Sequence, residues 1–107
     1  MADRAHPTQQ DDALRQARHD TLVRTTASAL ITAIAEYLAD TRPGDYMVEA
    51  SRQYLASSYA KAHATLDSAF AEELTARLLK LMPTPHHNEH RGTYAQRLRS
   101  VAGKAGA

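Results

Sequence analysis

The chain contains no cysteine and no tryptophan among its 107 residues. The missing cysteine excludes disulfide bonds, thiolate metal sites and a cysteine nucleophile. No apolar run reaches the 18 or so residues that a membrane-spanning helix requires. The first twelve residues are polar and lack the apolar centre of a signal peptide. From these absences we expect a cytoplasmic protein that does not enter a membrane.

Residues that interrupt helices are also scarce. Glycine and proline occur four times each, and clusters of β-branched residues that could form strands are few. Alanine is abundant, and it loses no side-chain entropy in a helix. A chain of this length is typical of one domain. The composition therefore predicts a single all-α domain over residues 1–107.

The first helix is expected over residues 8–40. Thr8 and Asp11 have the spacing of a capping box, in which each side chain bonds an amide near the helix start. Apolar residues then recur at steps of four and three, the pattern of a helix with one packed face. They are Val23, Ala27, Leu30, Ile34 and Tyr37.

Thr41-Arg42-Pro43-Gly44-Asp45 is the strongest break in the chain. Proline disfavours helical geometry in the residue before it, and glycine tolerates the positive φ that a tight turn can need. The same helical periodicity then resumes and runs over residues 45–82, with a break near Ser57-Ser58 as an alternative. A loop this short makes its flanking helices antiparallel, so we expect a long helical hairpin.

Two prolines, Pro83 and Pro85, end the second helical pattern. Residues 83–92 are expected to form a loop. A short third helix is expected over residues 93–102, because Thr93 and Gln96 match a second capping box.

Apolar residues outside the two main seams need a cover that one hairpin cannot supply. Leu22 and Ile31 are such residues in the first helix, and Met47, Tyr54, Phe70 and Leu79 in the second. We expect two hairpins to associate into a four-helix bundle as a homodimer. The alternative is a break in the second helix that folds the chain into a compact monomeric bundle.

The densest group of potential metal ligands is His86-His87-Asn88-Glu89-His90. His86 and His90 have a spacing that would place both imidazoles on one side of a helix. The glutamate is not where a His-Glu-x-x-His zinc site needs it, and the flanking Pro85 and Gly92 disfavour a helix. We expect a solvated loop, and we expect no metal, no cofactor and no catalytic residue.

The C-terminal segment is basic, with Arg91, Arg97, Arg99 and Lys104 against the single acid Glu89. Such cations could neutralise phosphates, so a nucleic-acid-binding protein with a basic C-terminal helix is the alternative function. Against it, only Tyr94 offers a stacking aromatic nearby. No helix-turn-helix or zinc-finger pattern is present.

Tyrosine is common at interfaces because it joins an apolar ring to a polar tip. The spacing places Tyr59 in the core seam and leaves Tyr46 and Tyr54 for the surface. The leading hypothesis is a non-enzymatic regulator or inhibitor that occludes a protein partner's surface. The small size of the chain and its alanine- and arginine-rich composition suit an accessory protein of a bacterium or phage. The expected partner-binding residues are Tyr46, Tyr54, Arg91, Arg97 and Arg99.

Overall fold

The computed structural model describes residues 9–105, and the fold over this range is all-α, as predicted. The helices are α1 (Gln9–Asp40), α2 (Glu49–His63), α3 (Ser68–Leu81) and α4 (Arg91–Ala105). An isolated antiparallel bridge between Tyr46 and His90 is the only β pairing in the described range. None of the helices within that range is both long and apolar enough to cross a membrane.

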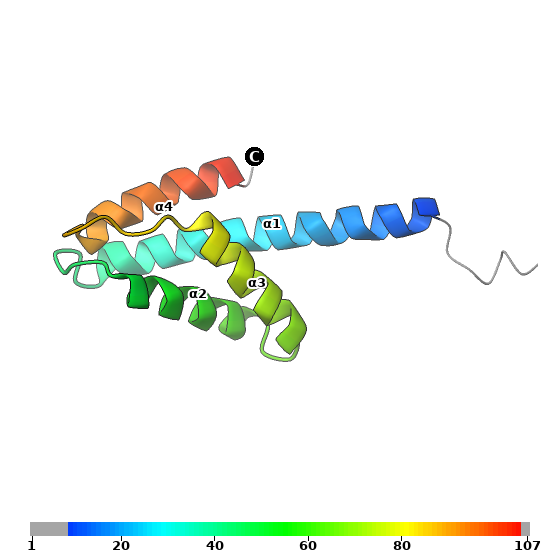
Figure 1. Ribbon diagram of the computed structural model, residues 1–107, viewed down its shortest axis with the longest axis horizontal. Helices are drawn as coiled ribbons and strands as arrows, with labels where there is room; N and C mark the ends of the chain where they lie inside the picture. Colours follow the sequence, from blue (N-terminus) through cyan, green and yellow to red (C-terminus); the bar gives the residue numbers. More distant parts are fainter. Residues whose placement is uncertain (1–8, 106–107) are drawn as a thin grey trace, which may run out of the picture.

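The four helices form two antiparallel pairs, α1 with α4 and α2 with α3 (Figure 1). The Ser28 hydroxyl in the middle of α1 donates to the Ala102 carbonyl near the end of α4 (2.8 Å). At the start of α2, the Arg52 guanidinium donates to the Leu79 carbonyl near the end of α3 (3.2 Å). The N-terminal part of α1 projects beyond the other helices, and residues 10–18 are exposed (Figure 1).

One core joins all four helices, because each turns its apolar face inward. Tyr94 and Leu98 of α4 are fully buried against α1, and α3 contributes Leu74 and Leu78. The buried stripe of α1 repeats at helical spacing and consists of Val23, Ala27, Ile31, Ile34, Ala35 and Leu38.

The predicted helix over residues 45–82 is two helices, and the break falls at residues 64–67 rather than near Ser57-Ser58. Both serines lie inside α2. Asp67 is the N-cap of α3, and its carboxylate accepts a hydrogen bond from the Phe70 N–H (3.0 Å). An aspartate in this position satisfies an amide that has no partner within the helix, and so favours a new helix start.

With α3 folded back on α2 and α4 packed along α1, most of the apolar excess is covered within one chain. Ile31 is fully buried and Met47 is 2% exposed. Phe70 and Leu79 are partly buried against the core. Leu22 and Tyr54 stay exposed. The break in the second helix, considered as an alternative, is therefore present, although it lies at residues 64–67.

The turn between α1 and α2 is built differently from the expectation. Arg42 has the positive φ, 48°, whereas Gly44 has none.

α4 begins at Arg91, so Thr93 lies inside the helix and is not its N-cap. The Pro43 carbonyl takes that role in part, accepting the Gly92 N–H at 3.0 Å. The predicted cap at Thr8 lies outside the described residues.

Candidate protein-binding surface

The loops that precede α2 and α4 are held together by backbone hydrogen bonds. The Met47 N–H donates to the Glu89 carbonyl (2.7 Å), and the Arg91 N–H donates to the Asp45 carbonyl (2.8 Å). Between these bonds, the Tyr46 ring stacks on the His90 imidazole with centroids 5.2 Å apart. The pairing places Tyr46 beside the start of α4, at the end of the molecule where α1 finishes.

A shallow groove of about 240 Å³ lies at this same end. It is lined by Tyr37 from α1, Ala50, Ser51, Tyr54 and Leu55 from α2, and Arg91 from α4. The Arg91 guanidinium carbon lies 5.4 Å from the centroid of the Tyr37 ring, within the range of a cation–π contact. We call Tyr37, Tyr46, Tyr54, His90 and Arg91 the tyrosine–arginine surface.

Its tyrosines are open to solvent. Tyr54 is 70% exposed, Tyr46 58% and Tyr37 40%. The surface positions expected for Tyr46 and Tyr54 are therefore confirmed, while their role in binding stays a prediction. The core spacing had assigned Tyr37 to the seam. Tyr37 lies in the last turn of α1, next to the Thr41–Asp45 break. This position is the feature of the sequence that indicates a place at the end of the molecule.

Arg91 carries unused hydrogen-bonding capacity. Its Nε and Nη2 atoms are buried and have no hydrogen-bond partner within residues 9–105. These two nitrogens share one edge of the guanidinium plane, the edge that pairs with a carboxylate in a bidentate manner. The edge is covered, so an acceptor would reach it only after the groove side chains shift.

Arg97 is not available to a partner in the way the sequence suggested. Its Nη1 lies 2.5 Å from Oε1 of Glu89, whose side chain is 3% exposed. The same carboxylate oxygen accepts the His86 N–H (2.9 Å). The guanidinium also lies over the Tyr94 ring, 5.6 Å from its centroid. Arg97 therefore neutralises a buried acid that anchors the loop before α4.

Arg99 is exposed and makes no ion pair within the described range. It follows Arg97 by two residues, which turns it by about 200° around the helix. The two arginines consequently lie on opposite flanks of α4 and form no common basic stripe. Of the five predicted binding residues, Tyr54 and Arg91 line one groove and Tyr46 lies beside it on His90. Arg97 is engaged by Glu89, and Arg99 lies on another flank of α4.

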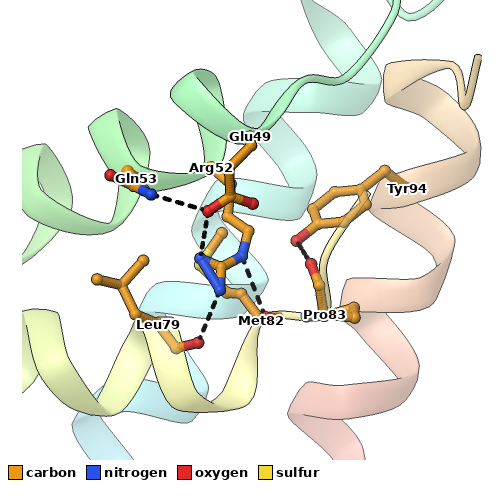
Figure 2. A network of polar contacts seen from close by, with 7 residues as sticks. All are labelled: Glu49, Arg52, Gln53, Leu79, Met82, Pro83 and Tyr94. Carbon is orange, nitrogen blue, oxygen red and sulfur yellow. Dashed lines mark hydrogen bonds and ion pairs between the residues drawn. The ribbon is translucent and has the colours of Figure 1, made fainter. Parts of the chain in front are cut away.

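Polar contacts tie the start of α2 to the end of α3, and tie α4 to the loop that follows α3 (Figure 2). The Arg52 Nε donates to the Met82 carbonyl (3.3 Å), and its Nη1 pairs with Oε2 of Glu49 (3.2 Å). The Tyr94 hydroxyl donates to the Pro83 carbonyl (2.5 Å). Helix carbonyls at a C-terminus lack partners within the helix, and here a guanidinium supplies the donors. Helical spacing in the sequence gives no sign of this role of Arg52.

Burial raises the pKa of Tyr94 to about 12, although the positive charges of Arg52 and Arg97 oppose the shift. The hydroxyl therefore stays protonated and continues to donate to Pro83 throughout the neutral range.

The histidine loop shows no converging ligands. His86 and His87 are exposed, and His90 is engaged with Tyr46. No group of three or more histidine, aspartate or glutamate side chains within residues 9–105 could hold a metal ion.

Comparison with protein-family models, with curated proteins and with solved structures found no match.

Proposed function

We propose that this chain is a non-enzymatic helical protein that binds a protein partner and regulates or inhibits it by occluding part of the partner's surface. The observation that carries the proposal is an open groove lined by Tyr37, Tyr54 and Arg91, with the exposed Tyr46 stacked on His90, the residue before Arg91. Tyrosine and arginine are the residue types enriched where proteins bind one another tightly.

The local fold supports a preformed surface. The loops that carry Tyr46 and His90 are joined by backbone hydrogen bonds, and Arg52 fixes α2 to the end of α3. A backbone held in this way loses little conformational freedom on binding. Once the groove side chains shift, the Arg91 edge favours a partner that presents an acidic side chain near the groove. We further propose that the protein acts in the cytoplasm, because a chain without cysteine has no disulfide bond that a reducing environment would break.

Affinity capture from the host tests this proposal through matched variants. The tagged wild-type chain is compared with a Tyr46→Ser/Tyr54→Ser double variant and with Leu14→Ser, which alters an exposed leucine on the distant part of α1. We expect one protein to be recovered with wild type and Leu14→Ser and to be depleted with the tyrosine double variant. Equal recovery in all three would remove the tyrosine–arginine surface from the account.

Charge reversal on α4 is confined to Arg99, because Arg97→Glu would place a second carboxylate beside Glu89. Arg99→Glu is the variant that leaves the ion pair with Glu89 intact. A gel-shift series with this variant across salt concentrations distinguishes the nucleic-acid alternative from binding to a protein partner. Binding to nucleic acid at low salt that Arg99→Glu weakens would favour that alternative over a protein partner.

A further inference from the structure

A second open surface lies at the opposite end of α2, where α2 turns into α3. It is a groove of about 700 Å³ between these helices. Its lining is dominated by small side chains, among them Ser57, Ala64, Ser68, Ala71 and Thr75, together with Leu79. Leu66, in the turn beside the groove, is 100% exposed. The groove itself is the candidate interaction surface, because a single exposed apolar side chain such as Leu66 is common on protein surfaces.

Two opposite charges stand on the two walls of this groove. Lys61 belongs to the α2 wall and Glu72 to the α3 wall. Within the described range they form no ion pair with each other or with any other residue. They lie at similar distances from the turn, five residues before Leu66 and six after it.

We propose that this surface binds a second copy of the chain, so that α2 and α3 of two protomers form a four-helix bundle. A two-fold axis parallel to the groove would bring each α2 wall over the partner's α3 wall. That rotation sets Lys61 of each protomer opposite the partner's Glu72, and sets the two Leu66 side chains against each other on the axis. An interface of this symmetry must be self-complementary. This surface meets that requirement because one wall carries a positive charge and the other a negative charge.

Other features of the hairpin fit the same arrangement. α2 has 15 residues and α3 has 14, so four helices of matched length would face the axis. Small residues on a helix face let a neighbouring helix approach closely, which brings more atoms into contact. No residue of this surface belongs to the tyrosine–arginine surface. The inference is therefore independent of the proposed function and can fail or succeed separately.

A double charge exchange tests the pairing. By sedimentation equilibrium, wild type should change from monomer to dimer mass with rising concentration. Lys61→Glu and Glu72→Lys should each raise the dimer Kd roughly ten-fold, about 1.4 kcal/mol. The double variant Lys61→Glu/Glu72→Lys should return to a Kd near that of wild type. A monomer mass at all concentrations, or no recovery in the double variant, would overturn the proposal.

Single-cysteine variants give a second test, which reports the position of the two-fold axis rather than the charge pairing. Because the chain has no cysteine, Leu66→Cys and Leu22→Cys each introduce one thiol at an exposed position. Under mild oxidation Leu66→Cys should form a covalent dimer quickly, since its Cβ atoms would meet near the axis. Leu22→Cys is the matched control and should oxidise slowly. Equal rates for the two variants would contradict the proposed axis.

Discussion

Gly92 donates its backbone N–H to the Pro43 carbonyl at 3.0 Å, and this contact joins the first turn of α4 to the turn after α1. A Cβ atom at Gly92 would stand 3.3 Å from the Pro43 Cβ, closer than ordinary van der Waals contact. The proline ring is rigid and cannot easily move away. The close approach therefore depends on the absence of a side chain at this position.

Replacement of two glycines in the same helix tests that dependence. Gly103, near the end of α4, has open space around its Cα. Gly103→Ala should raise the free energy of unfolding by up to about 1 kcal/mol, because alanine favours the helix. Gly92→Ala should show no such gain, since crowding against Pro43 cancels it. Urea denaturation measures both, and equal gains would show that the contact with Pro43 is loose.

Arg97 should be needed for stability rather than for binding. Arg97→Leu leaves the buried Glu89 carboxylate without its cation, and we expect the free energy of unfolding to fall by roughly 2–4 kcal/mol. Arg99→Leu serves as the control and should change it by less than about 0.5 kcal/mol. Thermal or urea unfolding followed by circular dichroism compares the two. Similar small effects from both substitutions would contradict the structural role given to Arg97.

Tyr94 should make stability depend on alkaline pH. The pKa of Tyr94 is raised from 10.0 to about 12 in the folded chain, mainly by burial. In the unfolded chain the hydroxyl loses its proton near pH 10, while the folded chain still holds it. This contribution is therefore complete below pH 10 and is lost as the pH rises toward 12.

Tyr94→Phe removes that dependence and also the hydrogen bond to Pro83. We expect the variant to be less stable by about 1 kcal/mol at neutral pH. Its stability should then fall less steeply than that of wild type between pH 10 and pH 12. Tyr54→Phe, at a 70% exposed position, is the control and should keep the wild-type slope. The prediction fails if Tyr94→Phe and wild type show parallel pH profiles.

Asp67 should hold the break between α2 and α3 in place. Asp67→Ala removes the acceptor for the Phe70 N–H and should cost about 1 kcal/mol, whereas Asp67→Asn keeps an acceptor and should cost less. Hydrogen exchange at the Phe70 amide gives the direct readout. Faster exchange is expected in Asp67→Ala alone, and unchanged protection in that variant would mean that the cap contributes little.

The sequence predicted the helical class and the first helix well, because both depend on composition and on local periodicity. The bounds of α1, Gln9–Asp40, agree with the expected 8–40 within the described residues. The break at residues 64–67 had a local signal that was overlooked: an aspartate at the N-cap position, directly after Thr65-Leu66. Apolar residues recur at helical spacing on both sides of the break, because two helices can keep the same periodicity across a short turn. The pattern therefore resembles one continuous helix.

Other features had no local signal. That α4 packs along α1, and that a proline carbonyl caps α4, depends on contacts between segments far apart in the chain. The role of Arg97 follows from Glu89 being buried, which spacing alone does not reveal. For the same reason the tyrosine–arginine surface could be predicted only in part. The sequence singled out Tyr46, Tyr54 and Arg91 as residues, but not the groove that Tyr54 and Arg91 form with Tyr37.

The central claim, that the tyrosine–arginine surface binds a protein partner, is tested most directly by site-specific photo-cross-linking in the native host. A photo-reactive phenylalanine analogue is placed at position 54, and the same analogue at position 14 serves as the control. Both native side chains are exposed, Tyr54 at 70% and Leu14 at 50%. The account predicts a discrete covalent adduct with one host protein from position 54 and none from position 14. Absence of an adduct from position 54, or the same adduct from both positions, would contradict it.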